Sequence, residues 1–120
     1  RDSSVTGVQT CALPILQKQK DVMILCAGWN NRFNIEDALF GGALADRLMV
    51  KGYAPASDAT QVALSMWQEA KSDLRGYINR TEHIKRLEAN NLQDSVEYCL
   101  TVDTANLVPL YDNVNKVLKL

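Results

Sequence analysis

The sequence of 120 residues has few of the residues that mark the simplest functional classes. It contains 1 histidine and 3 cysteines, without C-x-x-C spacing, so neither a zinc site nor a disulfide framework is indicated. Its 13 basic and 14 acidic residues leave a formal net charge of -1, which gives no electrostatic footprint for nucleic acid or an anionic membrane. No apolar run approaches the length of a membrane span. Evidence for function must therefore come from local motifs.

The most informative segment runs from residue 22 to residue 48. Residues 22–25 form a short apolar run that is typical of a buried strand, and Gly28 ends the run. A polar loop follows, and Asn34 is a good N-cap for a helix whose first turn is acidic. In open α/β sheets, ligands bind beyond the carboxyl ends of strands, where helix N-termini face the site. The segment therefore has the form of a small-anion site.

The rest of the chain predicts helices followed by a β-hairpin, without a linker that would divide it. The helices are expected over residues 35–51, 59–71 and 81–89. Residues 92–102 fit either a helix begun at Asp94 or an alternating strand. Two apolar segments, 107–111 and 114–120, flank a polar turn and predict the hairpin. The expected fold class is α/β.

The first two predicted helices contain glycines, a cap residue and a buried face that the sequence also indicates. Gly41 and Gly42 lie in the middle of the first helix, where each costs about 1 kcal/mol against alanine, so close packing against a neighbour should compensate. We expect Asp58 to cap the second helix and Gly76 to break the chain after it. The predicted buried stripe of the first helix consists of Ala38, Leu39, Gly42, Leu48 and Met49.

Three separated blocks resemble the signature of the 2-phosphosulfolactate phosphatase family. The first block contains Cys26-Ala27-Gly28, Asn31-Arg32-Phe33, Glu36-Asp37 and Gly42-Ala43, similar to the family's CAG…F.LED.L.AGA. The others are Thr81-Glu82-His83, similar to S-x-H, and Tyr98-Cys99 through Asp103 to Val108-Pro109, similar to C…D…VP. Trp29 stands where many members have Thr and Ile84 where many have Gly, which indicates a divergent branch.

The resemblance implies a cytoplasmic, magnesium-dependent phosphoric monoester hydrolase that releases phosphate from 2-phospho-3-sulfolactate, a step toward coenzyme M. It also implies a layered α/β/α fold, of which residues 16–120 would be the C-terminal half because the family's chains are longer. The missing half would supply further ligands, so this fragment alone is expected to be inactive. Apolar patches meant for that half would face water and favour a homo-oligomer or aggregation.

Residues 1–15 differ in origin from the rest of the chain on one interpretation of the sequence. The stretch from Val5 to Ile15, VTGVQTCALPI, looks like the in-frame translation of a common sequencing adapter, with residues 1–4 joined to it. A natural N-terminal strand and turn is the alternative interpretation. Non-native segments are left out of fold reasoning, so on the first interpretation the natural sequence begins at about Leu16.

Glu36 and Asp37 are the candidate magnesium ligands, and Glu36 is also a candidate catalytic residue. A phosphatase needs hard oxygen ligands for an ion that neutralises charge on the phosphoryl oxygens. The structural alternative is that the helix dipole favours acidic residues in a first turn. Adjacent helical positions point about 100 degrees apart, so we expect one of the two to act and the other to cap.

Arg32 is the candidate for gripping the substrate. Its planar fork can hold phosphate, carboxylate or sulfonate through two parallel hydrogen bonds, although a solvated loop arginine is the alternative. Asn30, Asn31 and the amide of Gly28 are further candidates for substrate binding, because glycine lets the backbone approach an anion. His83, the sole histidine, is the candidate general acid, or else a solvated residue of a helix turn.

Cys26 and Trp29 are ambiguous. A nucleophilic cysteine needs a lowered pKa, and we expect Cys26 instead to be a buried structural residue. Trp29 fits either a residue that stacks on a ligand or one that covers the core.

Two functions from different classes therefore remain open. The first is a metal-assisted phosphatase for a small, multiply anionic acid. The second is a non-catalytic α/β domain that binds a small anion or pairs with another subunit. Acidic and Gly/Asn-rich loops upstream in the parent gene favour the enzyme, and a native start near Leu16 favours the binding domain.

Overall fold

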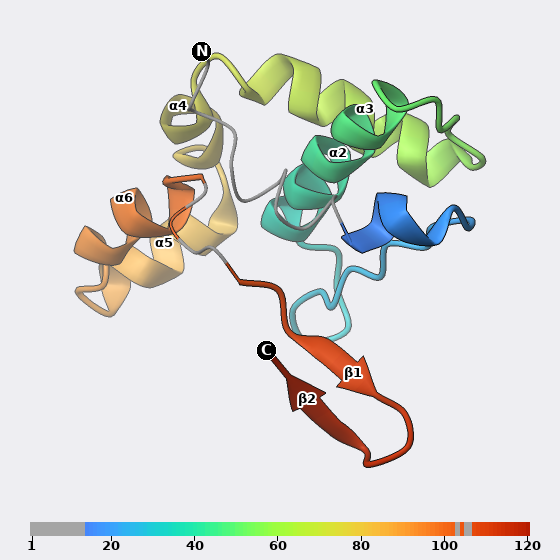
Figure 1. The fold of residues 1–120 in the computed structure, drawn as a ribbon. Coiled ribbons are helices and arrows are strands. Elements are labelled where there is room, and N and C mark those ends of the chain that lie inside the picture. The colour runs from blue at the N-terminus through green and yellow to red at the C-terminus, as the bar shows by residue number, and fades with distance from the viewer. Residues whose placement is uncertain (1–13, 103, 105–106) are drawn as a thin grey trace.

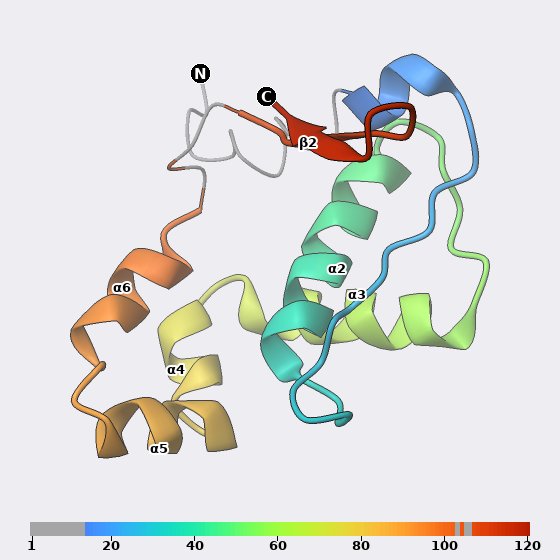
Figure 2. The same ribbon diagram turned by 90° about the horizontal axis from the view of Figure 1, so that it is seen from below.

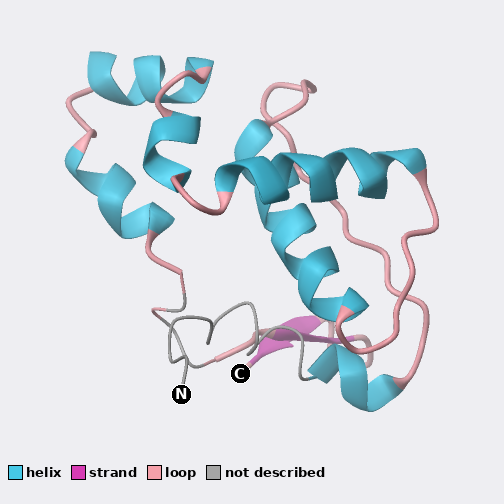
Figure 3. Ribbon diagram, turned by 90° about the horizontal axis from the view of Figure 1, so that it is seen from above, coloured by secondary structure: helices cyan, strands magenta, loops and turns pink. Residues whose placement is uncertain are grey.

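The computed structural model describes residues 14–102, 104 and 107–120. Within them the chain is mostly helical, with one small antiparallel sheet (Figures 1 and 3). A helical turn at 14–18 precedes α2 (Ile35–Met49), α3 (Asp58–Ala70), α4 (Leu74–Ile78), α5 (Glu82–Ala89), α6 (Asp94–Leu100), β1 (Leu110–Asp112) and β2 (Val117–Lys119). Most of the segment 1–15, which we expect to be non-native, lies outside the described residues. Asp103 of the third signature block also lies outside them. None of the described helices is both long and apolar enough to cross a membrane.

Helix α2 joins the two parts of the hydrophobic core. One end contributes the buried Ala43, Leu44 and Leu48, against which the partly buried Val22 and Ile24 pack. The other end contributes Leu39 to a second cluster that draws on α3 to α6 and contains Leu39, Ala70, Ile78, Ile84 and Val96. In Figure 1, α4, α5 and α6 accordingly lie to one side of the crossed pair α2 and α3.

The two mid-helix glycines of α2 have different surroundings. A Cβ atom on Gly42 would lie 2.1 Å from the carbonyl oxygen of Ala63 in α3, so only glycine permits this close approach. A Cβ atom on Gly41 would lie 3.6 Å from Ile24 Cγ2, which is an ordinary van der Waals distance. The predicted close packing is confirmed, and Gly42 is the residue that allows it.

The predicted strand at residues 22–25 is wrong. These residues are extended and run beside α2, but they form no ladder within the described chain (Figure 2). Val22 and Ile24 pack on α2, whereas Met23 is 90% and Leu25 89% exposed. The side chains therefore alternate as in a strand, but the described residues provide no neighbouring strand to complete a sheet.

Three smaller predictions about the helices are also corrected. Ser57 caps α3, since its Oγ accepts a hydrogen bond from the Thr60 N–H at 3.2 Å, and Asp58 is the first helical residue. Gly76 lies within α4, where its N–H donates to Asp73 Oδ1 at 2.9 Å, so it makes no break. Met49, expected in the buried stripe, is 44% exposed at the end of α2.

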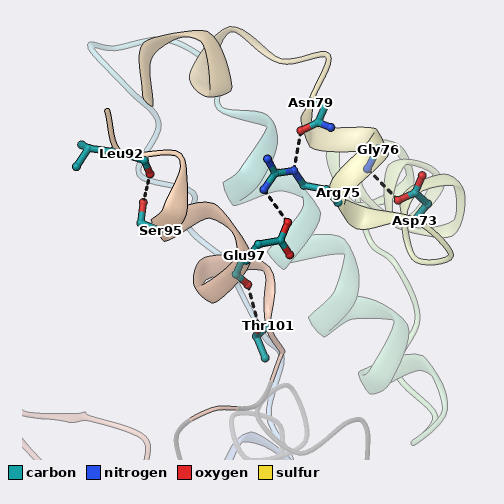
Figure 4. A network of polar contacts seen from close by, with 8 residues as sticks. All are labelled: Asp73, Arg75, Gly76, Asn79, Leu92, Ser95, Glu97 and Thr101. Atoms are coloured by element: carbon teal, nitrogen blue, oxygen red, sulfur yellow. Dashed lines mark hydrogen bonds and ion pairs between the residues drawn. The ribbon is translucent and has the colours of Figure 1, made fainter. Parts of the chain in front are cut away.

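Within residues 92–102 the segment Asp94–Leu100 forms helix α6 rather than a strand, and a polar network joins this helix to α4 (Figure 4). Arg75 Nη1 lies 2.8 Å from Glu97 Oε1, and Arg75 Nε donates to Asn79 Oδ1 at 2.9 Å. At the end of α6, the Thr101 hydroxyl donates to the Glu97 carbonyl at 2.7 Å. Because the ion pair is exposed, it contributes at most about 1 kcal/mol, and burial of the Val96 side chain stabilises this contact more.

The C-terminal hairpin is confirmed, although its strands are shorter than predicted. Leu110, Tyr111 and Asp112 of β1 pair antiparallel with Lys119, Leu118 and Val117 of β2. Asp112 organises the turn, because its Oδ1 accepts hydrogen bonds from the N–H groups of Val114 at 2.9 Å and Asn115 at 3.1 Å. Its carboxylate also pairs with Lys119 across the two strands.

The contrast between the two glycines yields a stability prediction. Gly42→Ala should lower the free energy of unfolding by about 1–3 kcal/mol, because the added methyl meets the Ala63 backbone at 2.1 Å and overpacks the contact. Gly41→Ala is the matched control and should raise that free energy by up to about 1 kcal/mol, through helix propensity. Urea unfolding followed by circular dichroism measures both. Equal gains in the two variants would contradict the close α2–α3 contact.

Candidate active site

A tight turn at residues 29–32 forms one wall of the candidate site. Trp29 and Arg32 make an isolated antiparallel bridge, with N–H···O distances of 3.0 and 2.9 Å. Asn30 and Asn31 between them both have positive φ, at 49° and 59°, as a type I′ turn requires. Asparagine tolerates this conformation better than most residues. The sequence Asn-Asn therefore bends the chain and presents the flanking Trp29 and Arg32 side by side.

Gly28 and Asp37 attach this turn to the first turn of α2. The Gly28 N–H donates to Asp37 Oδ2 at 2.6 Å. Gly28 has a φ of +72°, and a Cβ atom there would lie 2.6 Å from the Arg32 carbonyl oxygen, so no other residue fits without strain. One carboxylate oxygen of Asp37 is thus engaged in holding the loop.

The start of α2 brings Glu36 to the site. Asn34 caps the helix, since its Oδ1 accepts a hydrogen bond from the Glu36 N–H at 2.8 Å. The Glu36 carboxylate points across to the first turn of α5, where its Oε1 lies 3.5 Å from His83 Nε2. Both side chains are about one-third exposed, at 35% and 29%. Two residues that are 47 positions apart in the chain, Glu36 and His83, therefore form a pair.

Helix α5 places His83 between a carboxylate and a guanidinium. Arg86 Nη2 lies 3.4 Å from His83 Nδ1, on the opposite side of the ring from Glu36. A guanidinium can only donate and a carboxylate can only accept, so these neighbours suit the imidazole tautomer with its proton on Nε2. The Arg86 guanidinium also lies over the Trp29 ring, 5.6 Å from its centroid. Arg86 thereby connects α5 to the 29–32 turn.

The two walls enclose a pocket of about 690 Å³. It lies between the start of α2, with the loop before it, and the start of α5. Its lining residues are Trp29, Asn30, residues 32–36, residues 80–83 and Arg86. Both helices direct their N-terminal ends to the pocket, and such ends carry unpaired N–H groups and partial positive charge.

Charge in the pocket favours an anionic ligand. Three arginines line it against two glutamates, in addition to the two helix N-termini. Arg80 is largely engaged elsewhere, since its Nη2 lies 2.7 Å from Glu69 Oε1 and its guanidinium covers the Tyr77 ring at 4.0 Å. The hydrogen bond with Glu69 raises the pKa of Arg80 above its ordinary value. Arg32 and Arg86 are therefore the cations best placed to meet a ligand.

The predicted site residues separate into two groups. Asn30, Arg32, Glu36 and His83 line the same pocket, whereas Gly28, Asn31 and Asp37 stand behind it and shape the loop. Sequence reasoning did not select Thr81 and Arg86 as binding residues, although both line the pocket. Thr81 could have been selected because it belongs to the second signature block. Nothing local distinguished Arg86 from other helix arginines.

Cys26 is exposed, so its expected burial is wrong. Five residues separate it from Arg32, which is the C-x5-R spacing of cysteine phosphatase loops. Arg32 lines the pocket but Cys26 does not. The Trp29–Arg32 bridge closes the turn between them, so this segment does not wrap around a common centre as a phosphate cradle would.

The fit to a magnesium ion depends on few protein ligands. Across the described ranges, no three His, Cys, Asp or Glu side chains come together as a metal-binding group. Glu36 and Glu82 are the carboxylates that line the pocket, and the Glu36 Oε1 faces His83. Magnesium commonly takes one or two protein carboxylates and completes its shell with substrate oxygens and water. Glu36 is compatible with that pattern, through its second oxygen.

Comparison with known proteins identifies relatives named probable 2-phosphosulfolactate phosphatase. A family model described as 2-phosphosulpholactate phosphatase matches residues 3–114. A probable 2-phosphosulfolactate phosphatase of Synechococcus sp. (strain WH7803) is 34% identical over 119 residues, which cover 91% of this chain and 48% of the relative. Proteins with the same name from Caldanaerobacter subterraneus subsp. tengcongensis and Thermotoga maritima are 27% and 28% identical, covering 89% and 87% of this chain and 44% of each relative.

The chain thus spans about half the length of the curated relatives that it matches. The family match extends over both walls of the pocket, from the turn at residues 29–32 to Arg86 in α5. With residues 3–114 matched, the chain belongs to the 2-phosphosulpholactate phosphatase family.

Proposed function

We propose that the protein hydrolyses 2-phospho-3-sulfolactate, or a related small anionic phospho-acid, to 3-sulfolactate and phosphate. The observation that carries this proposal is the pocket itself. The first signature block supplies Arg32 and Glu36, the second supplies His83, and these residues line one cavity although they are distant in sequence. The name of these relatives suggests the substrate, and the cationic lining supports a ligand with several negative charges.

The proposal places this chain within a larger protein. Residues 16–120 would form the C-terminal half of a layered α/β/α fold in a cytoplasmic enzyme on the route to coenzyme M. The exposed side chains of Met23 and Leu25 would be covered by the rest of such a fold, because only Val22 and Ile24 of this extended segment pack on α2. We expect the 120-residue chain alone to release no phosphate.

Binding is assigned to groups from both walls. Arg32 holds one anionic group of the substrate through paired N–H donors, and the Asn30 side chain adds a neutral donor beside it. The N-termini of α2 and α5 attract the remaining negative charge. Because these groups belong to helices and a closed turn, their positions are set before the substrate arrives, which limits the entropy lost on binding.

His83 is assigned the proton transfer. In its doubly protonated form the ring can give its Nε2 proton to the ester oxygen that leaves as the P–O bond breaks, while a water molecule forms the new bond to phosphorus and returns a proton to the ring. Glu36 and Arg86 on the two sides of the ring fix its orientation. A bound magnesium ion would neutralise charge on the phosphoryl oxygens, and Glu36 is the residue that would hold it.

Phosphate release by the protein expressed from its complete gene tests the proposal. Turnover of 2-phospho-3-sulfolactate should require magnesium. Arg32→Ala should lower kcat/KM about 10- to 100-fold, the value of one hydrogen-bonded charge, and His83→Ala about 100-fold or more. Glu36→Gln should lower it about 100-fold and raise the magnesium concentration needed. If the folded protein hydrolyses none of a panel of phospho-acids, the proposal fails and the non-catalytic anion-binding domain takes its place.

Asp37 has a structural assignment that can be separated from metal binding. Asp37→Asn keeps a side-chain oxygen that can accept from the Gly28 N–H, whereas Asp37→Ala removes it. We therefore expect Asp37→Asn to keep kcat/KM and the affinity for magnesium. Asp37→Ala should lower kcat/KM, because the loop loses its attachment to α2. A magnesium affinity reduced equally in both variants would identify Asp37 as a metal ligand.

Cys26 provides a test of covalent catalysis. A cysteine nucleophile would lose all turnover on replacement by serine. Because Cys26 lies outside the pocket lining, we expect Cys26→Ser to keep kcat within about 3-fold, the usual scatter for a change of about 0.5 kcal/mol at an exposed site. Rapid-quench detection of a phosphocysteine, together with loss of activity, would overturn the metal-assisted mechanism.

A further inference from the structure

Two buried polar atoms in the described residues lack a hydrogen-bond partner, and the two residues that carry them line the same pocket. They are Thr81 Oγ1 and Arg86 Nε. Thr81 is only 5% exposed. A buried donor or acceptor that stays unpaired costs free energy, so native proteins leave few of them. Within the described chain, both residues line one pocket that favours anions. We take this as an indication that a ligand supplies the missing hydrogen-bond partners.

The N-terminus of α5 is also incompletely capped. Thr81 occupies the N-cap position with extended backbone angles, but its side chain makes no capping hydrogen bond. At the corresponding position of α2, Asn34 does cap, and so does Ser57 in α3. A threonine hydroxyl at this position ordinarily accepts from the second or third helical N–H. In α5 the Thr81 hydroxyl therefore does not pair with the first-turn N–H groups.

Arg86 is held in place beside this helix end. His83 contacts its Nη2 at 3.4 Å, Glu82 lies 3.8 Å from its Nη1, and its Cζ lies over the Trp29 ring. The Glu82 side chain is 87% exposed, so this carboxylate neutralises the guanidinium only weakly. The contacts leave Nε without a partner. Arg86 is thus an oriented cation with an unused donor.

We infer that Thr81, Arg86 and the first-turn amides of α5 bind one tetrahedral oxyanion of the ligand, a phosphoryl or sulfonate group. In naming the ligand, this inference rests on the proposed function. Arg32 on the opposite wall holds a different anionic group, which matches a substrate that carries more than one. Thr81 Oγ1 and Arg86 Nε are covered in the ligand-free structure, so ligand binding has to uncover these two atoms.

Calorimetric titration of the complete gene product with inorganic phosphate tests the inference without requiring turnover. Thr81→Val removes the hydroxyl and should raise the Kd about 10-fold, and Arg86→Met should raise it about 10- to 100-fold. Two controls should leave the Kd unchanged. Thr81→Ser keeps the hydroxyl, and Arg75→Met removes an arginine of similar exposure, 37% against 40%, that lies outside the pocket lining. The same variants are titrated with methanesulfonate. If only the Kd for methanesulfonate changes, the subsite binds the sulfonate group.

Thermal stability separates binding from a structural role. Without phosphate, Thr81→Val should have a Tm equal to or above that of the wild type, because the substitution removes an unpaired buried hydroxyl. Phosphate should then raise its Tm less than that of the wild type. A lowered Tm with unchanged phosphate affinity would show that Thr81 is a helix cap only, and would overturn its assignment.

The remaining outcomes distinguish this inference from the proposed function. Unchanged affinity for both probes in Thr81→Val and Arg86→Met, or no binding by the folded wild type, overturns the subsite even if the enzyme turns over 2-phospho-3-sulfolactate. Phosphate binding that depends on Thr81 and Arg86 sustains the subsite even if no phospho-acid is hydrolysed. In that case the proposed function alone fails.

Discussion

The close contact between α2 and α3 at Gly42 is the constraint on which the site depends. Without a side chain at this position, α2 approaches the Ala63 backbone and contributes buried residues to both core clusters. Leu39, one turn earlier, then joins the cluster that contains Ile84 of α5. Packing on one side of α2 thus fixes where α5 begins relative to where α2 begins. The pocket is a consequence of that arrangement, because its two walls are these helix starts.

Two helix N-termini and a set of arginines at one pocket have an energetic cost in the empty protein. Like partial charges face each other across the cavity, and the described wall contains two unpaired buried polar atoms. Glu36 and Glu82 offset part of the positive charge, and an anionic ligand would offset the rest. A region that is less stable when empty gains most from a ligand of opposite charge, so the arrangement is better explained by binding than by folding.

Local patterns in the sequence predicted much of the fold, and they selected four residues that line the pocket, Asn30, Arg32, Glu36 and His83. Caps, periodicity and turn residues located α2, α3, α5 and the hairpin, because those signals act within a few residues, whereas α4 was missed because Gly76 indicated a break. Residues 22–25 could not be assigned correctly, since a strand exists only with a partner and the described residues supply none. Arg32, Glu36 and His83 were chosen through the signature blocks. Arg86 was missed because its role depends on contacts with Trp29, 57 positions away.

The acidic pair shows why a sequence motif mixes structural and chemical roles. Successive helical residues point about 100 degrees apart, so Glu36 and Asp37 cannot both face one cavity. Asp37 turns to the Gly28 N–H and holds the loop that carries Arg32, whereas Glu36 faces His83 across the pocket. The loop anchor is as necessary to the site as the residue that lines it. Without Asp37, the positive-φ turn at Asn30 and Asn31 would lose its attachment to α2, and Arg32 would no longer be directed to the pocket.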